Sequence, residues 1–453
     1  MNLHDLSATE QLGALRGGEV SSRELTEHYL RRIERLDAGL GAFITVTPEL
    51  AVEEAIRADK RIAEGEWAPL LGLPIGIKDL YPAAGVRTTF GSAALAGFVP
   101  PDDSWTTALV RRAGAVLVGK TNTAEFGATC YTHNDVTAQP AVTPYDRGRY
   151  SSGSSGGAAT AVAAGLLPLA TAGDGAGSTR TPAAACHLVG VKPSRGLVGS
   201  PALVSTTVEG PIARTVADAA LLLDVMADGH FAYETRKTLS VAVWTETGLG
   251  GRPHPQAVHA VERTAALLRE LGHDVREVPI PAVCDEPVRQ ALRKHFASSV
   301  HAAVSTLVPP DDRDMLLPYT RYLDTEGAAM PGSEVLAVQE VLAHYASAFL
   351  AAFEDFDVAL TPVTNGPPVP IGHFLADGVE AVAESMLAWS GYTPWANFTG
   401  QPAIALPSHL ADGLPYGVQL AGRPRREAEL LALAAQLEEA ALWRDIHPPC
   451  WDQ

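Results

Sequence analysis

The densest run of glycine and serine in this chain lies between Ser151 and Gly196, and it limits what the chain can fold into. It reads SSGSSGGAATAVAAGLLPLATAGDGAGSTRTPAAACHLVGVKPSRG, with two serine–glycine clusters on either side of small apolar residues. Glycine loses more conformational freedom on folding than any other residue, so an ordered segment of this kind needs a compensating purpose. Three purposes fit it: a flexible linker, a phosphate cradle, or a site where backbone amides and hydroxyls meet a substrate.

Bulk composition excludes several classes of protein. With 46% hydrophobic and 19% charged residues among 453, the chain has enough apolar surface for a large core and is not disordered. Its net charge of -18 argues against nucleic acid or an anionic membrane as partner, because both require a basic surface. The first twenty residues lack the basic start and apolar core of a signal peptide, and Pro168 interrupts the longest apolar run. We therefore expect a soluble, cytoplasmic protein without membrane contact.

The cysteines and potential metal ligands show no clustered spacing. Cys130, Cys186, Cys284 and Cys450 lie far apart, and no CxxC pair is present, which argues against a zinc ribbon or a thioredoxin-type site. The histidines and carboxylates likewise show no H-E-x-x-H or comparable spacing. The sequence therefore predicts a reduced, metal-independent protein.

Helical and strand patterns alternate along the whole chain, which predicts an α/β layered fold in a single domain. The first helix is marked by a capping box in which Glu24 follows Ser21 by three residues. Helices are expected at 21–36, 47–65, 106–114, 158–165, 215–229, 254–272 and 426–443, and strands at 69–81, 115–119, 238–244, 356–364 and 414–422. The segment 279–346 is polar and mixed and yields no interpretation.

Two familiar motifs occur in contexts that do not suit them. GAVLVGKT, from Gly114 to Thr121, matches the P-loop pattern, but its middle residues favour a buried strand rather than an open phosphate loop, so Lys120 is expected near a strand end. GSSGG places Ser155 at the centre of a G-x-S-x-G pattern. A nucleophile elbow requires an apolar strand before it, whereas here the polar TPYDRGRYS precedes it. We therefore favour a glycine-rich turn before a small-residue helix.

A third constellation combines two serines with a lysine. Ser154 and Ser178 stand at the two ends of the glycine-rich stretch, and Lys78 follows the apolar run LLGLPIGI. Burial there would lower the pKa of the lysine, and a neutral lysine can serve as the base that a serine nucleophile requires. The loop DGAGS before Ser178 offers successive backbone amides, as an oxyanion hole needs. A buried structural lysine remains the alternative.

Six blocks in order give the chain a resemblance to the amidase signature family, which hydrolyses carboxamides with a Ser–cis-Ser–Lys triad. These are GLPIGIKDLYPAAGVRTTFGS, GKTNTAEFG, the glycine-rich stretch itself, VEGPIARTVADAALLLDVM, NFTGQPAIALP and GLPYGVQLAGRP. The resemblance implies one domain over 1–453, with a mixed β-sheet covered by helices on both faces. The signature core would occupy about 60–225 and 353–440, and a variable, substrate-facing region about 241–352.

The resemblance also implies a role for each matched residue. Ser178 matches the nucleophile, Ser154 the bridging serine on a cis peptide bond, and Lys78 the base. The oxyanion hole would be made by backbone amides of Gly175, Ala176, Gly177 and Ser178, with Ser155, Asp174 and Arg180 in support. The reaction would be amide hydrolysis through an acyl-enzyme, without a metal or organic cofactor.

Three positions near the nucleophile depart from the family pattern or need interpretation. Ala176 replaces a glycine but keeps its amide, which preserves the oxyanion hole if the local dihedrals suit a Cβ. Asp174 and Arg180 are expected to form an ion pair that braces the loop. His187 stands where small residues are usual, and we expect a core histidine with satisfied hydrogen bonds.

Two other functions stay open. One is the A-type component of a tRNA-dependent amidotransferase complex, although the segment 311–335 shows none of the features that we associate with that component. The other is a non-catalytic binding protein on the same scaffold, which the retention of all three triad positions argues against. The expected partner is a small-molecule amide, and a homodimer stays open. The aromatic residues Trp389, Tyr392 and Trp395 hint at a pocket for an apolar acyl group.

Overall fold

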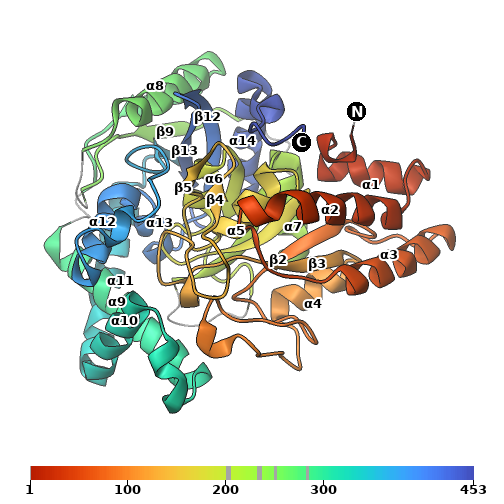
Figure 1. Ribbon diagram of the computed structural model, residues 1–453. Coiled ribbons are helices and arrows are strands. Elements are labelled where there is room, and N and C mark those ends of the chain that lie inside the picture. Colours follow the sequence, from red (N-terminus) through yellow and green to blue (C-terminus); the bar gives the residue numbers. More distant parts are fainter. Residues whose placement is uncertain (1, 200–205, 232–236, 249–251, 282–284) are drawn as a thin grey trace.

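One mixed sheet of eleven strands runs through the computed structural model, which describes residues 2–199, 206–231, 237–248, 252–281 and 285–453 (Figure 1). The strand order is β1-β3-β2-β6-β8-β7-β12-β13-β11-β9-β10, and β4 and β5 form a separate hairpin. The strands are β1 (Phe43–Val46), β2 (Pro74–Lys78), β3 (Val116–Thr121), β4 (Val142–Thr143), β5 (Asp146–Tyr150), β6 (Leu169–Asp174), β7 (Val189–Lys192), β8 (Val208–Ala213), β9 (Ser240–Val243), β10 (Asp274–Glu277), β11 (Val358–Pro362), β12 (Ala403–Ala411) and β13 (Leu414–Gly422).

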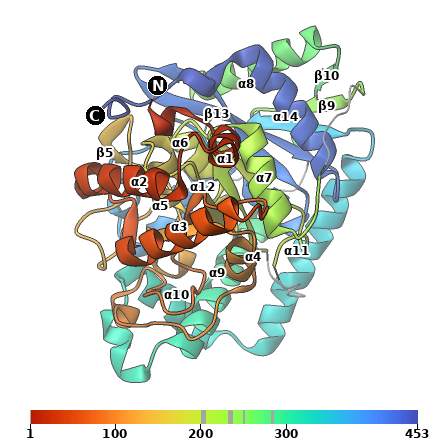
Figure 2. The same cartoon turned by 90° about the vertical axis from the view of Figure 1, so that its right-hand side faces the viewer.

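The helices cover both faces of this sheet, as expected from the sequence. They are α1 (Ala8–Gly17), α2 (Ser22–Leu36), α3 (Pro48–Ala63), α4 (Trp105–Arg112), α5 (Gly156–Ala163), α6 (Arg180–Ala185), α7 (Val216–Met226), α8 (Pro255–Glu270), α9 (Glu286–Leu307), α10 (Pro318–Ala329), α11 (Gly332–Ala352), α12 (Val382–Ser390), α13 (Pro394–Phe398) and α14 (Glu427–Ala441). Figure 2 shows α1, α7, α8 and α14 on the side that faces the viewer.

The two faces of the sheet differ in side-chain size because successive strand residues point to opposite faces. Leu360 and Leu420 belong to the core that includes α7, α8 and α14. Their neighbours Ala359 and Ala421 belong to the opposite core, which includes α9, α11 and α13. Alanines also dominate where β6 meets α5 and α6. Small side chains let those helices approach the sheet closely, and these helices carry or border the site described below.

Most elements predicted from periodicity are present in the structure. Ser21 caps α2, and the capping box with Glu24 is formed. The P-loop-like segment is strand β3, so that expectation is confirmed, and Lys120 within it forms a buried ion pair with Asp79 at 3.3 Å. The polar segment before Ser155 contributes to the hairpin β4–β5, which lies outside the main sheet, so the geometry of a nucleophile elbow does not arise.

The uninterpreted segment 279–346 contributes to the group α9, α10 and α11, which lies together at the lower left of Figure 1. Within the described residues, α11 is the helix that is long and apolar enough to cross a membrane, judged by length and composition alone. A packed helix of a soluble protein passes the same test. Val338, Leu342 and Phe349 of α11 pack into the core beside α9, while its other face is exposed.

Candidate active site

The candidate site lies where β2 and β6 end. These two strands are parallel neighbours, with Gly76 opposite Ala170, so their carboxyl ends meet at one edge of the sheet. That edge is where ligands bind in open α/β sheets. Lys78 is the last residue of β2, and its backbone N–H donates to Thr171 Oγ1 of β6 at 3.0 Å. The loop after β6 leads within four residues of Asp174 to Ser178, which brings the two predicted residues to the same edge.

The Lys78 side chain is fully buried and contacts two of the four serines in the 151–155 turn. Its Nζ lies 2.7 Å from Ser154 Oγ and 2.7 Å from Ser155 Oγ, and 3.4 Å from the carbonyl oxygen of Gly173. Burial lowers the pKa of the Lys78 amine from its usual 10.5 to about 7, against the opposing effect of the Asp174 and Glu209 carboxylates. At neutral pH a substantial fraction of this lysine is therefore uncharged.

The turn that carries Ser154 and Ser155 is fixed by backbone and hydroxyl contacts. The Gly153–Ser154 peptide bond is cis, as the resemblance implies. A Cβ on Gly153 would lie 2.6 Å from the Tyr131 backbone, so only glycine fits there. The Ser154 carbonyl accepts from the Ala124 N–H at 3.2 Å and from the Thr132 hydroxyl at 3.3 Å. These contacts hold Ser154 beside Lys78.

Ser155 links Lys78 to the strand and to the loop of Ser178. Its Oγ donates to the Gly173 carbonyl and accepts from the Gly173 N–H, both at 3.2 Å. Its N–H donates to the Ser178 carbonyl at 3.3 Å. These contacts place Ser155 between Lys78 and the loop of Ser178, and its supporting role stays a prediction.

Ser178 differs from the two other serines because its side chain is partly exposed and lines a cavity. Among the described residues, its hydroxyl makes no hydrogen bond to Ser154 or to another side chain. A serine hydroxyl moves between staggered rotamers at low cost, and hydrogen bonds of catalytic groups often tighten only when substrate is bound. The hydroxyl is thus accessible from the cavity and close in sequence to the amide-rich loop.

The predicted oxyanion hole needs one correction. The Gly177 N–H donates to Asp174 Oδ1 at 2.7 Å, so this amide is already engaged and does not point free into the site. The amides of Gly175, Ala176 and Ser178 have no acceptor among the described residues. Ala176 is absent from the residues with positive φ, so its Cβ is accommodated, and its carbonyl accepts from Thr393 Oγ1 at 2.6 Å. A Cβ at Gly177 would overlap the same hydroxyl.

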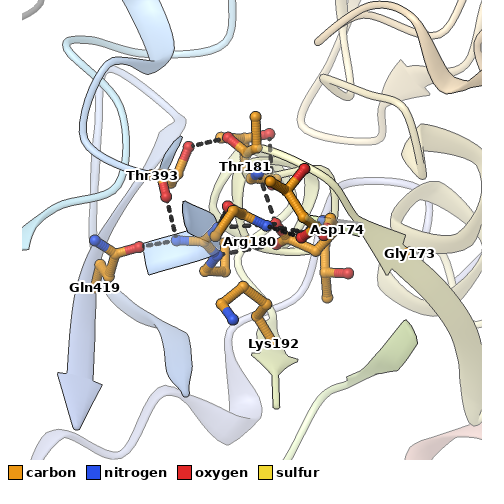
Figure 3. Close-up of polar contacts among 12 residues, drawn as sticks. Gly173, Asp174, Arg180, Thr181, Lys192, Thr393 and Gln419 are labelled. Atoms are coloured by element: carbon orange, nitrogen blue, oxygen red, sulfur yellow. Dashed lines mark hydrogen bonds and ion pairs between the residues drawn. The ribbon is translucent and has the colours of Figure 1, made fainter. Parts of the chain in front are cut away.

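The ion pair expected between Asp174 and Arg180 is present and fully buried (Figure 3). Arg180 Nη2 lies 2.8 Å from Asp174 Oδ1 and Nε lies 2.9 Å from Oδ2. Burial alone would raise the pKa of this carboxyl, but the Arg180 guanidinium more than offsets it and holds the pKa well below its usual range. Asp174 is therefore charged, and its carboxylate fixes the loop by accepting from the Gly177 and Thr179 amides.

Residues that the sequence did not single out complete this network. Arg180 Nη1 donates to the Thr393 carbonyl at 2.9 Å and to Gln419 Oε1, and Nη2 donates to Asn397 Oδ1 at 2.7 Å. Figure 3 shows Thr393 and Gln419 approaching the guanidinium from elements distant in sequence. Asn397 and Gln419 lie within the blocks that carry the family resemblance, and Thr393 lies just before one. Their place in or beside these blocks is the one sequence signal that could have identified them.

Glu209 is a second carboxyl near the lysine and is half-buried. The pairing of β6 with β8 places it opposite Gly173, whose carbonyl oxygen lies 3.4 Å from Lys78 Nζ. Burial raises the pKa of Glu209 to about 7, and its Oε2 has no hydrogen-bond partner in the described part of the chain. No motif marks Glu209 in the sequence, because its place depends on strand register.

The cavity at Ser178 has a volume of about 430 Å³. Its walls come from the 127–130 and 176–178 loops, from α9 and α10, and from α12 with the start of α13. Of the segment 241–352, residues between Gln290 and Glu334 line the cavity, and its substrate-facing role stays a prediction. The three aromatic residues proposed from the sequence do not line the cavity: Trp389, Tyr392 and Trp395 are at most 7% exposed and belong to the core. Met386, Leu387, Ser390 and Pro394 line it instead.

His187 is buried, as predicted, but its hydrogen bonds are not satisfied. Both ring nitrogens lack a partner within the described ranges, and burial lowers the pKa of the ring to about 3. It lines a separate small cavity with Tyr145 and His447. The structure therefore confirms the expected burial of His187 but shows no hydrogen-bond partner for its ring among the described residues.

Cys130, Cys186 and Cys450 are free thiols, while Cys284 lies outside the described residues. In the same described ranges no group of three or more His, Cys, Asp or Glu side chains is arranged to hold a metal ion. Metal independence stays a prediction.

A family model and several known sequences match this chain over most of its length. The family model described as Amidase matches residues 24–431. The protein of Mycobacterium bovis named "Putative amidase AmiB2" is 37% identical over 458 residues, covering 97% of each chain. The A-type component of the glutamyl-tRNA(Gln) amidotransferase of Chromohalobacter salexigens is 34% identical over 495 residues, covering 98% of this chain and 99% of that protein.

Solved structures agree with the sequences. A 6-aminohexanoate cyclic dimer hydrolase in complex with its substrate matches with a TM-score of 0.89 and 28% identity, over 100% of both chains. A bacterial aryl acylamidase of the amidase signature enzymes matches with a TM-score of 0.87 and 25% identity, over 98% of both chains. Both structural matches thus extend over nearly the whole chain.

Proposed function

Because this chain belongs to the amidase signature family, we propose that it is an amidohydrolase that cleaves a carboxamide C–N bond through an acyl-enzyme on Ser178. The observation that carries this proposal is the contact between the buried, partly neutral Lys78 and Ser154 Oγ at 2.7 Å, beside a partly exposed Ser178. It supplies a base, a relay and a nucleophile at one edge of the sheet.

In the proposed first step, neutral Lys78 accepts a proton from Ser154, and Ser154 deprotonates Ser178 as its Oγ attacks the amide carbonyl. The tetrahedral oxyanion is held by the free amides of Gly175, Ala176 and Ser178, which cost no reorganisation because the loop is already fixed. The proton returns through Ser154 to the leaving nitrogen as the C–N bond breaks. Water then cleaves the ester and restores the Ser178 hydroxyl.

The fixed Asp174–Arg180 pair supports this assignment of roles. A buried carboxylate bound to a guanidinium and two loop amides cannot serve as a mobile base without leaving charges unpaired. Its part is to position the loop of Ser178, and Lys78 is left as the base. Ser155 positions the Lys78 amine through its hydroxyl.

A labelling experiment tests this function directly. Treatment with a fluorophosphonate followed by mass spectrometry should place the label on Ser178, and the Ser178→Ala protein should neither be labelled nor hydrolyse a panel of aliphatic, aryl and peptide amides. A label on Ser155 would contradict the proposal and favour an α/β-hydrolase-like mechanism. A folded protein that takes no label and hydrolyses no amide would favour a non-catalytic binding protein.

The second candidate is the A-type component of a tRNA-dependent amidotransferase complex. The similarity to such a component over 98% of this chain favours it. Copurification with the other components of such a complex, or ammonia release from glutamine, would establish it over the independent amidase.

A further inference from the structure

The cavity at Ser178 has an apolar interior. Its wall includes Leu292 and Phe296 of α9, Leu323 of α10, and Met386 and Leu387 of α12. Cys130 also lines it, and burial raises the pKa of this thiol so far that it stays neutral. A substrate group that enters from the mouth therefore exchanges water for apolar side chains, which favours groups without charge.

The charged residues of the cavity wall are mostly acidic. Arg293, a wall residue, is paired with Glu384, and Lys294 is paired with Glu334 at 2.6 Å. Each wall cation is thus already neutralised by a carboxylate. The remaining wall acids are Glu326 and Glu380.

Neither Glu326 nor Glu380 forms an ion pair with another described residue. They lie on neighbouring elements, α10 and the short helical turn 379–381. A carboxylate brought into this cavity would find both wall cations already paired and would face these two acids. The charged side chains of the wall are partly exposed, so solvent screens them, and the main penalty for a carboxylate comes from the buried apolar residues of the same wall.

We propose that this cavity selects amides whose side group ends without a negative charge, and that the pairing of Arg293 with Glu384 is part of the exclusion of carboxylates. This inference rests on the amidohydrolase function proposed above. It predicts a neutral, apolar amide as substrate class and disfavours glutamine, whose α-carboxylate would enter the same space. It also assigns Glu384 a role in specificity, although its own side chain is outside the cavity wall.

Three amides of similar length test the selectivity: hexanamide, 6-aminohexanamide and the monoamide of adipic acid, which end in a methyl group, an ammonium and a carboxylate. The wild-type kcat/KM for the carboxylate amide should be lower than that for hexanamide by at least about 30-fold. The reason is that moving an unpaired carboxylate from water to an apolar wall costs more than the free energy that corresponds to a tenfold change in affinity. The ammonium amide should be affected less.

The variant Glu384→Gln frees Arg293 to meet the substrate carboxylate. It should raise the kcat/KM ratio of carboxylate amide to hexanamide by roughly two- to fivefold, the effect of one partly exposed ion pair. Glu354→Gln is the matched control, since it removes an equally negative, exposed side chain just beyond the far end of α11 and should leave the ratio unchanged.

The outcomes separate this inference from the proposed function. If fluorophosphonate labels Ser178 and hexanamide is hydrolysed, but the carboxylate amide reacts equally well, the selectivity is wrong and the amidohydrolase stands. An equal rise in the ratio for Glu384→Gln and Glu354→Gln would show a general charge effect and overturn the role of the Arg293–Glu384 pair. If neither labelling nor hydrolysis is observed, both fail together.

Discussion

Replacing Lys78 by methionine should destroy activity and at the same time stabilise the protein. Methionine has nearly the length of lysine and is apolar, so it fits the buried site without leaving a cavity. The loss of the base should lower kcat/KM by about 10²- to 10⁴-fold. Lys78→Arg should be no better, because a guanidinium stays charged at every accessible pH. The gain in stability follows from the cost of burying this amine.

The magnitude comes from the pKa of Lys78. A decrease from 10.5 in the unfolded chain to about 7 in the folded one means that the unfolded state binds the proton more tightly. The cost to folding is absent well above pH 10.5, grows as the pH falls, and reaches about 5 kcal/mol below pH 7. At pH 9 it is still about 2 kcal/mol. Lys78→Met also loses the two hydrogen bonds from Lys78 to Ser154 and Ser155, and this loss offsets roughly 2 kcal/mol of the gain in stability.

Lys78→Met should therefore raise the free energy of unfolding by about 2–3 kcal/mol at pH 6 and leave it nearly unchanged at pH 9. Chemical denaturation at both pH values measures this. Lys120→Met is the comparison: burial lowers the pKa of this lysine to about 8, but its removal also leaves the buried Asp79 carboxylate unpaired, so this variant should not gain stability at pH 6 as Lys78→Met does. A Lys78→Met protein that is destabilised equally at pH 6 and pH 9 would refute the buried, partly neutral amine.

The remaining predictions concern the pH profile, the serines and metals. Wild-type kcat/KM on an activated ester should fall about tenfold per pH unit below pH 7, as protonation removes the base; a flat profile down to pH 5 would exclude Lys78. Glu209, whose pKa is raised to about 7, is only partly ionised where Lys78 titrates, so Glu209→Gln should move the acid limb to lower pH by at most roughly half a unit; a shift to higher pH would contradict this electrostatic role. Ser178→Ala should abolish turnover with the fold intact, whereas Ser155→Ala should be far milder. Activity should survive a chelator, and recovery by zinc after its loss would contradict metal independence.

Local sequence patterns were enough to predict most elements and to single out the candidate residues of the site. The capping box of Ser21 and the apolar strand before Lys78 each depend only on residues close in sequence. The structure contains both as predicted. Periodicity also identified GAVLVGKT as a strand against its P-loop pattern. The sequence wrongly assigned Trp389, Tyr392 and Trp395 to the pocket, because an aromatic residue looks the same in a sequence whether it lines a pocket or fills a core.

Long-range pairing decided what no local pattern contains. The sequence by itself determined that Lys78, Ser154 and Ser178 are present in motifs of the right kind, since residue type and spacing are local properties. Only the tertiary structure brought Lys78 Nζ to 2.7 Å from Ser154 Oγ, engaged the Gly177 amide with Asp174, and set Glu209 opposite Gly173. The lowered pKa of Lys78 is likewise a property of the tertiary structure. It depends on burial and on carboxylates of other strands, which surround the amine only once the sheet has formed.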